Sequence, residues 1–440
     1  MKIALVTVYS HTHCTLKDVA GGYGTVFQIG HSSRARILEK AKSELARMAS
    51  PVLGYLAAVA ERSGHSVHVV ELQRHERSRD EVPQGFDIAC VLTSMVDASA
   101  ERDVMSALHR AGTHTIAFGA YATAKPEFFL DAATVVVRGE PEGLGEALFD
   151  RSKRGVIDAG YIDDLDALPF PSWSAFPTST FRYALLTRET TLPVQGVRGC
   201  AFGCNYCPFR ATAPFRQRSP ENVVAEIAHL KSRYGARGIA FRDPLFNLDR
   251  DRVKALAAGV KPLDVKFSAE MRADRLDASL LRTLREAGLR SLEIGVESVN
   301  LGMLSDAKRQ PPSLREIRDV VKEAHGLGIR VIANFMFGLP DDTEETIKET
   351  VAFAKELNTF AVQFTIATPY PGTTLTTRVQ NLLRKERPES YTGWEPTFEH
   401  PSMSADTLRR LREWAYVSYH YRPRYMARFA SHALGALFDA

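Results

Sequence analysis

The sequence predicts an α/β protein in which a doubly wound domain precedes a partial parallel barrel and a small helical cap. Three observations support this fold class. Apolar runs rich in Val and Ile, typical of buried parallel strands, alternate with helix-spaced segments along most of the chain. A proline-rich join at Leu168–Ser172 divides these alternations into two series. The 440 residues allow two or three domains, at about 150 residues each.

The first domain is expected over residues 1–160, where strand and helix alternate as in a doubly wound sheet. The predicted strands are Lys2–Val8, Val67–Leu72, Ile88–Thr93, Thr115–Phe118 and Thr134–Val137, and the predicted helices are Ser50–Ser63, Ala98–Ala111 and Glu127–Ala133. About forty residues, His11–Ser50, separate the first strand from the first helix. Because such connections usually take about two to six residues, a loop this long indicates a functional role.

The barrel is expected over residues 161–375, and the helical cap over residues 376–440. The predicted barrel strands are Leu192–Gly196, Gly238–Phe241, Val265–Ala269, Ser291–Gly295, Val331–Phe335 and Val362–Ala367, with helices at Glu221–Tyr234, Arg250–Ala257, Ala278–Ala287, Leu314–Leu327 and Thr343–Leu357. Six strands with crossover helices describe a partial (β/α)6 barrel rather than a closed barrel of eight. Two helices, Ala405–Tyr419 and Pro423–Phe438, are expected in the cap.

Composition and charge exclude several classes of protein. The 56 Lys and Arg residues against 52 Asp and Glu leave a net charge of +4 without a basic tail or stripe, so nucleic-acid binding is not indicated. No stretch approaches the roughly 18 apolar residues of a membrane span, and the apolar N-terminal run is too short for a signal peptide. Five cysteines are too few for a disulfide framework, which favours a reducing cytoplasm.

Three of the cysteines, Cys200, Cys204 and Cys207, form a C-x-x-x-C-x-x-C pattern directly after the first barrel strand. A structural zinc site needs a fourth ligand, which only the distant segment His11–Cys14 would offer. A 4Fe–4S cluster suits three thiolates better, because it then keeps one iron open for another ligand. An electron carrier normally completes four cysteine ligands, so the open iron favours an enzyme.

The cysteine loop after the first strand of such a barrel resembles the radical S-adenosylmethionine superfamily. Further segments resemble the same superfamily in order: Arg198–Cys200, Arg216–Glu221, Gly295–Ser298, Gly338–Pro340 and Pro369–Thr373. The resemblance implies that the open iron chelates S-adenosylmethionine and that the cluster cleaves it to a 5′-deoxyadenosyl radical. A dry cavity is then needed to keep the radical from reacting elsewhere.

The resemblance also implies roles for residues at strand ends, where a parallel barrel carries its active site. Tyr206 is expected against the adenine, and Asp243 at the methionine amino group, although the usual Gly-Gly-Glu is absent there. Glu270 and Arg272 are expected at the ribose and the methionine carboxylate. Glu297 is similar to the ribose-side acid of the superfamily.

The N-terminal domain is similar to the Rossmann-like cobalamin-binding domain that precedes the barrel in one large branch of the superfamily. The matching segments are Pro51–Ala58, Ser63–His65, Gly119–Thr123 and Arg138–Glu140. No Asp-x-His-x-x-Gly motif stands in residues 1–150, so the imidazole ligand of that motif is excluded. Because the insertion His11–Ser50 follows the first strand, where such a sheet binds its ligand, we expect it to fill the corrin space. Cobalamin is therefore expected not to bind.

The insertion resembles the leader of the radical diol dehydratases that act on aminoglycosides in 3′-deoxygenation. This resemblance implies a substrate such as paromamine, hydrogen abstraction at its 4′ carbon, and loss of the 3′ hydroxyl as water. It also implies a flavodoxin- or ferredoxin-type reducing partner and a downstream NAD(P)H-dependent reductase.

General acid and base groups near the barrel mouth would serve this chemistry, and the candidates are Asp18, Glu293, Asp341 and Tyr370. The alternative function is a cobalamin-dependent radical methyltransferase, which would use the same barrel with a corrin in the N-terminal domain. If the protein retains corrin absorbance after purification with hydroxocobalamin, the methyltransferase is favoured over the dehydratase.

Overall fold

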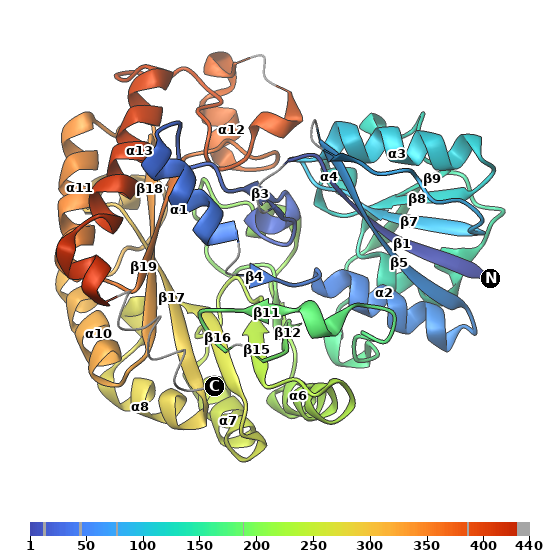
Figure 1. The fold of residues 1–440 in the computed structure, drawn as a ribbon, viewed down its shortest axis with the longest axis horizontal. Helices are drawn as coiled ribbons and strands as arrows, with labels where there is room; N and C mark the ends of the chain where they lie inside the picture. Colours follow the sequence, from blue (N-terminus) through green and yellow to red (C-terminus); the bar gives the residue numbers. More distant parts are fainter. Residues whose placement is uncertain (12–14, 44–45, 76–77, 188, 385–386, 429–440) are drawn as a thin grey trace.

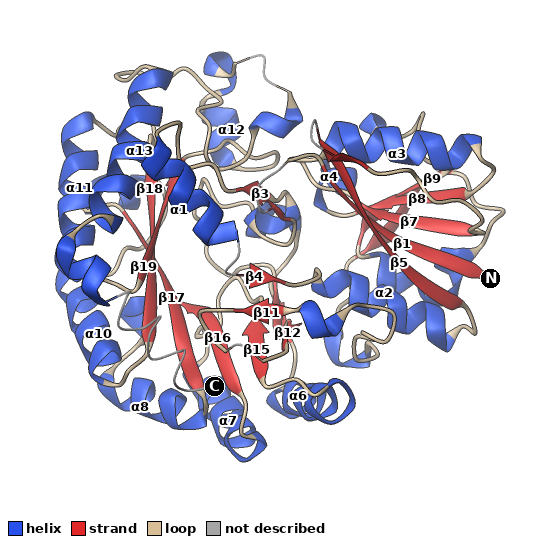
Figure 2. Cartoon of the chain, viewed as in Figure 1, coloured by secondary structure: helices blue, strands red, loops and turns tan. Residues whose placement is uncertain are grey.

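The computed structural model describes residues 1–11, 15–43, 46–75, 78–187, 189–384 and 387–428. Two sheets lie side by side, one in each half of the molecule (Figure 1). Both consist almost entirely of parallel strands with helices packed on their faces (Figure 2). The predicted α/β fold class is therefore confirmed.

The N-terminal sheet has seven strands in the order β10-β9-β8-β7-β1-β5-β6. Its strands are β1 (Lys2–Tyr9), β5 (Ser66–His75), β6 (Ser78–Arg79), β7 (Ile88–Leu92), β8 (His114–Phe118), β9 (Val135–Gly139) and β10 (Gly155–Gly160), and only β6 pairs antiparallel. Helices α2 (Pro51–Arg62) and α3 (Ala98–Arg110) cover opposite faces (Figure 1). Accordingly, Ile3 and Leu5 pack into one hydrophobic core and Ala4 and Val6 into another.

Two expectations for this domain differ from the structure. Strand β10 was not anticipated, because it is an edge strand without a buried residue and lacks the apolar run that marks a central strand. The helix expected at Glu127–Ala133 is wrong: the crossover between β8 and β9 is made by α4 (Ala120–Ala124) and the short 3-10 turn Pro126–Phe128. Pro126 lacks an amide hydrogen, so α4 does not continue through it.

The barrel sheet has six parallel strands in the order β12-β15-β16-β17-β18-β19, as expected. The strands are β12 (Thr191–Val194), β15 (Gly238–Phe241), β16 (Lys266–Met271), β17 (Leu289–Glu297), β18 (Arg330–Phe337) and β19 (Ala361–Ile366). The helices α6 (Pro220–Tyr234), α7 (Arg250–Val260), α8 (Ala278–Ala287), α10 (Leu314–Gly326) and α11 (Glu344–Leu357) form its outer layer (Figure 2). The carboxyl end of β15 faces the N-terminal domain, because Arg242 lines a cavity together with residues of that domain.

The cap contains α12 (Thr374–Arg378) and α13 (Ala405–His420), and α13 packs along β19. The Tyr416 hydroxyl accepts a hydrogen bond from the Phe364 backbone, which fixes this helix to the barrel. Residues 423–428 are also helical, and the rest of the expected helix Pro423–Phe438 lies outside the described residues.

The insertion after β1 crosses from the first domain to the barrel and the cap. It contains β2 (Thr15–Leu16), the 3-10 turn η1 (Ala20–Gly22), β3 (Thr25–Val26), α1 (Ser33–Ser43) and β4 (Ala46–Arg47). Helix α1 lies beside α13, and β4 pairs antiparallel with β11 (Arg182–Tyr183) at the start of the second half (Figure 1). The insertion therefore acts as an interdomain connector.

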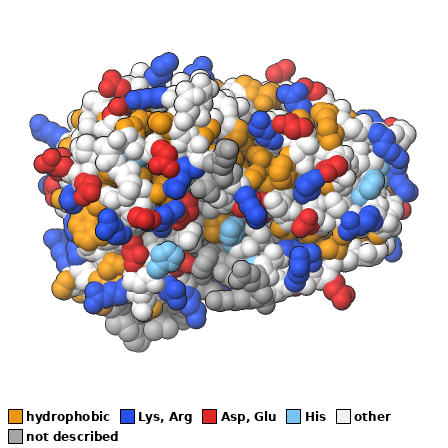
Figure 3. Space-filling view, turned by 90° about the horizontal axis from the view of Figure 1, so that it is seen from above, with side chains coloured by type: hydrophobic (Ala, Val, Ile, Leu, Met, Phe, Trp, Pro, Cys, Tyr) orange, Lys and Arg blue, Asp and Glu red, His pale blue; other side chains and the backbone are white. Residues whose placement is uncertain are grey.

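Acidic and basic side chains are interspersed over the face drawn in Figure 3, as the near-balanced composition predicts. Among the described residues, no helix combines the length and apolar character that crossing a membrane requires.

Candidate active site

The cysteine loop begins directly after β12 and β13 (Val197–Arg198), and its three thiols are free and partly exposed. Two backbone hydrogen bonds hold the loop: the Asn205 amide donates to Ala307, and the Leu375 amide donates to Asn205. The zinc alternative depends on the segment His11–Cys14, of which residues 12–14 lie outside the described residues. An all-sulfur donor set of three fits a 4Fe–4S cluster instead.

Next to the cysteine loop lie Tyr206, Glu297 and Arg309. The buried Tyr206 hydroxyl has no hydrogen-bond partner among the residues that the structure describes, so it is available to a ligand. The strand β17 contains a register shift between Gly295 and Glu297, and Glu297 adopts a left-handed φ of 68°. Bulges and strained residues of this kind re-aim side chains and cluster at functional sites. The Arg309 guanidinium lies 3.4 Å from the Glu297 carboxylate and donates to the Gly295 carbonyl at 2.6 Å.

The Arg272 side chain contacts other side chains of the protein. Its guanidinium makes two hydrogen bonds to Asp274, at 2.9 and 2.7 Å, and lies over the ring of Phe202, 4.3 Å from its centroid. Because Phe202 belongs to the cysteine loop, these contacts connect the third barrel strand to that loop. Arg272 is thus positioned beside the cluster site, with two of its nitrogens already paired to a carboxylate.

The inside of the barrel holds a polar cavity. Its described lining includes Asp18, Tyr183, Arg242, Ser268, Glu270, Ser291, Glu293, Asn334 and Gln363. Glu270 and Glu293 face each other across neighbouring strands, and the Asn334 amide donates to Glu293 at 2.8 Å. Burial, together with the charges of Glu293 and Glu297, raises the pKa of Glu270 to about 8. Glu270 therefore holds its proton near neutral pH and can act as an acid or a hydrogen-bond donor.

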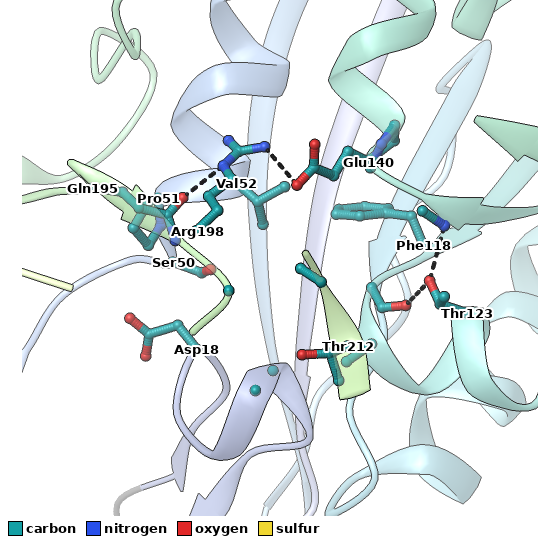
Figure 4. A pocket seen from close by; sticks show the side chains of 18 of the residues that line it. Asp18, Ser50, Pro51, Val52, Phe118, Thr123, Glu140, Gln195, Arg198 and Thr212 are labelled. Atoms are coloured by element: carbon teal, nitrogen blue, oxygen red, sulfur yellow. Dashed lines mark hydrogen bonds and ion pairs between the residues drawn. The ribbon is translucent and has the colours of Figure 1, made fainter. Parts of the chain in front are cut away.

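A second cavity lies between the two halves, at the carboxyl ends of β7, β8 and β9 (Figure 4). From the N-terminal domain its wall includes Leu92, Phe118, Gly119, Gly139 and Glu140. Across the cavity, Arg198 of the barrel lies 3.3 Å from the Glu140 carboxylate (Figure 4). This edge of a doubly wound sheet is where such folds bind their ligands.

The interdomain cavity continues into a larger lobe of about 700 Å³ lined by Tyr121, Arg138 and Tyr391, among others. Residues Ala120, Thr123, Tyr161 and Thr212 line both parts, so the two form one interdomain cleft. This cleft lies at the carboxyl edge of the N-terminal sheet and extends between the two domains. No histidine is among the residues described along it, so its described lining offers no imidazole to a cobalt ion.

The insertion brings two adjacent charged residues to the inner end of the cleft. The Lys17 ammonium is buried against Asp97 at 2.7 Å and Glu101 at 2.5 Å, both in the N-terminal domain. Asp18 accepts two hydrogen bonds from Arg242, at 2.6 and 3.0 Å, at the end of barrel strand β15. The expectation that Asp18 lies at the barrel mouth thus agrees with its position.

The remaining candidates from the sequence lie farther from this centre or have internal partners. Asp243 is buried and accepts from the amides of Gly196 at 2.7 Å and Val197 at 3.0 Å, so one of its oxygens caps the first barrel strand. Asp341 is half exposed and forms a surface ion pair with Arg378.

Tyr370 is buried, and its ring stacks on Tyr23 of the insertion with centroids 5.5 Å apart. The structure therefore brings Asp18, Glu270 and Glu293 together but leaves Asp341 on the surface.

Sequence reasoning missed three cations of the site: Lys17, which is buried, and Arg242 and Arg309, which are partly buried. Each is paired with a carboxylate from a distant part of the chain, and no local motif marks such a pair. The sequence did offer one signal for Arg242: it directly precedes Asp243 at the end of a predicted strand.

Comparison with known proteins agrees with this site. The profile of the Radical SAM superfamily matches residues 194–354. This part of the barrel therefore matches the radical SAM superfamily, as the cysteine loop and the segments around it predicted.

Two curated relatives align with most of this chain. An uncharacterized methyltransferase of Pyrococcus horikoshii is 26% identical over 408 residues, which cover 84% of this chain and 88% of that protein. The bacteriochlorophyllide d C-12(1)-methyltransferase of Chlorobaculum tepidum is 23% identical over 76% of this chain and 75% of its own length.

Among solved structures, the radical S-adenosylmethionine methyltransferase TsrM of Kitasatospora setae, with cobalamin and a 4Fe–4S cluster bound, aligns with a TM-score of 0.59 at 15% identity. The alignment covers 86% of this chain and 74% of TsrM. The cobalamin-dependent enzyme OxsB with aqua-cobalamin aligns at 0.55 and 15% identity, over 94% of this chain and 55% of OxsB. The fold of this chain is thus similar to that of these two enzymes over most of its length.

Two expectations from the sequence are corrected by these findings. The diol dehydratase activity on an aminoglycoside such as paromamine is wrong, because five of the eight relatives found are named methyltransferases and none of the eight is named a dehydratase. The expected absence of bound cobalamin is also wrong, because structures of this fold hold cobalamin. The physical reason lies in the insertion: it lies along the sheet edge, but a cleft remains between it, α4 and the barrel.

Proposed function

We propose that this protein is a cobalamin-dependent radical S-adenosylmethionine methyltransferase. The observation that carries the proposal is the interdomain cleft at the carboxyl edge of the N-terminal sheet, which meets the mouth of a barrel bearing the three-cysteine loop. The methyltransferase names of the relatives support the same conclusion.

In this proposal Cys200, Cys204 and Cys207 hold the cluster. When bound, the cluster and S-adenosylmethionine supply a 5′-deoxyadenosyl radical, and the corrin supplies a methyl carrier. Tyr206 and the Glu297–Arg309 pair lie beside the cluster site and would orient the adenosyl and methionine groups.

Within the barrel cavity, the Glu270–Glu293 pair would bind polar substrate atoms and hold a proton at Glu270. The walls of the barrel would shield a bound radical from bulk water. A flavodoxin- or ferredoxin-type protein would supply the electron, and a reducing cytoplasm suits three unpaired thiols.

The proposal is tested by anaerobic reconstitution with iron, sulfide and hydroxocobalamin. We expect one corrin per chain after gel filtration, and reductive cleavage of S-adenosylmethionine to 5′-deoxyadenosine. With methyl-labelled S-adenosylmethionine and a small-molecule extract of the native host, label should appear in a new product. The matched control replaces Cys200, Cys204 and Cys207 with Ala, which should remove the cluster and the cleavage but retain the corrin. Failure of the wild-type chain to retain corrin would contradict the proposal.

A further inference from the structure

One side of the cysteine loop is reached from the surface of the molecule. A groove of about 460 Å³ runs along it, and Cys200 is among the residues that line this groove. Ala201, Ala211 and Pro214 also line it, and all three are exposed. The groove adjoins the interdomain cleft, with which it shares Tyr161. A group of another molecule seated in the groove would therefore approach the cluster site from outside.

Two exposed arginines contact the tip of the cysteine loop. Arg275 lies over the ring of Phe202, with its guanidinium carbon 5.6 Å from the ring centroid. Arg210 lines the groove and lies against Gly203, since a side chain added at Gly203 would come within 3.0 Å of the Arg210 guanidinium. The exposed tip of the loop thus carries two positive charges.

A third exposed cation lies beside the same loop. The Asn205 amide donates to the Ala307 carbonyl at 2.9 Å, and the exposed Lys308 directly follows Ala307. We call Arg210, Arg275 and Lys308 the basic rim. None of the three forms an ion pair with a carboxylate in the described part of the chain. Their charges are therefore available to a partner.

The acids near the basic rim offset little of this charge. Asp274, next to Arg275, pairs with Arg272 at 2.7 Å. Asp249 accepts hydrogen bonds from the first backbone amides of α7, so its charge stabilises that helix. Asp306 remains as an exposed acid two positions before Lys308. The surface around the cysteine loop is therefore positive on balance.

The proposed chemistry requires an electron from another molecule, because reductive cleavage of S-adenosylmethionine consumes one electron each time. A positive surface attracts an acidic protein and orients it as the two approach. The apolar part of the groove, at Ala211, Ala213, Pro214 and Phe215, suits the exposed dimethylbenzene edge of a flavin.

We propose that the basic rim and the groove at Cys200 form the docking surface for an acidic flavodoxin, which delivers the electron through the flavin edge. This proposal rests on the proposed function. In the transfer the flavin is oxidised by one electron, the cluster is reduced by one electron, and no atom moves between the proteins. The residues of the basic rim act by holding the partner and take no part in the radical chemistry.

The test variants are Arg210→Glu, Arg275→Glu and the double variant, which reverse charges of the basic rim. Arg237→Glu serves as the matched control. Arg237 is exposed and directly precedes β15, so it lies at the amino end of the barrel strands, whereas the cysteine loop follows the carboxyl end of β12.

The first readout is the affinity of the reconstituted protein for an oxidised, acidic bacterial flavodoxin, measured by titration calorimetry. Each single reversal should weaken binding by about fivefold and the double variant by more than about tenfold, because repulsion replaces attraction. The wild-type affinity should also fall as the salt concentration rises from about 0.05 M to about 0.5 M. Arg237→Glu should bind like the wild type.

Equal affinities of the wild type and the double variant would overturn the docking surface, as would a wild type that does not bind flavodoxin. If an acidic ferredoxin shows the loss and flavodoxin does not, the identity of the partner is wrong.

The second readout is the cleavage of S-adenosylmethionine to 5′-deoxyadenosine with either reduced flavodoxin or dithionite as the electron source. In the double variant the flavodoxin-driven rate should fall by about tenfold at subsaturating flavodoxin. The dithionite-driven rate should equal that of the wild type, because a small reductant does not need the docking surface. Equal losses with both reductants would overturn the docking role.

The proposed function fails separately, if the wild type neither retains corrin nor cleaves S-adenosylmethionine with dithionite. In that case the affinity measurement alone decides whether the basic rim binds flavodoxin.

Discussion

At the scale of single residues, Lys17 is the buried cation on which the insertion depends. It neutralises Asp97 and Glu101, and its side chain is only 3% exposed. Removing one partner of a buried pair leaves an uncompensated charge, which costs about 3–5 kcal/mol.

We therefore predict that Lys17→Met lowers the free energy of unfolding by about 3–5 kcal/mol, measured by urea denaturation. The matched control is Lys125→Met, because Lys125 forms an exposed pair with Glu127. It should change stability by less than about 0.5 kcal/mol. Equal losses in the two variants would show that the buried charges are compensated in another way.

Glu270 makes the stability of the protein depend on pH. Its pKa is raised to about 8 by burial and by Glu293, so the folded state holds a proton that the unfolded chain releases near pH 4.5. Between these values the native state binds more protons than the unfolded state, and stability falls as pH rises.

We predict that the free energy of unfolding of the wild type falls from pH 5 to pH 8 more steeply than that of Glu270→Gln, which has no proton to lose. The difference in slope approaches about 1.4 kcal/mol per pH unit, and denaturation at several pH values measures it. Parallel profiles would mean that Glu270 is ionised in the native state.

At the scale of elements, the insertion is held to the cap as well as to both domains. The indole of Trp394 donates to Thr25 at 3.0 Å, and Phe27 packs edge-on against its ring at 5.4 Å. Trp394 is fully buried, so it supplies a large part of the apolar contact that keeps the insertion in place.

Trp394→Ala should lower the free energy of unfolding by about 3–5 kcal/mol and increase hydrogen exchange in β3, because the insertion loses its main apolar support. The control is Trp414→Ala, since Trp414 is 41% exposed on α13. Unchanged exchange in β3 would show that the two ion pairs alone retain the insertion.

At the scale of the whole molecule, the cleft between the domains links cofactor binding to overall stability. A ligand that binds only the folded chain stabilises it by mass action, by about 2.7 kcal/mol at a hundredfold excess over its Kd.

We predict this gain for hydroxocobalamin, measured by denaturation with and without the corrin. The comparison ligand is cyanocobalamin, in which cyanide blocks the upper face of the corrin. Its effect on stability indicates which face of the ring the protein contacts. No stabilisation at saturating concentration would contradict corrin binding in the cleft.

Much of the fold could be predicted because its signals are local. The six barrel strands match their apolar runs to within a few residues, since a buried parallel strand needs a continuous run of Val, Ile and similar residues. Cys200, Cys204 and Cys207 lie within eight positions of one another, so their spacing alone indicated a cluster. Strand β10 carries no such run and was missed.

The sequence by itself determined the order of the two domains, the cysteine loop and the presence of a long insertion after the first strand, because periodicity and spacing express these features locally. Only the tertiary structure decided that Asp18 pairs with Arg242, that Lys17 enters the opposite domain and that Asp341 stays on the surface. It also decided that the insertion leaves a cleft instead of filling it. The physical reason is that charge pairs and cavities depend on how distant segments pack, and loop length records how much chain is present but not where its side chains lie.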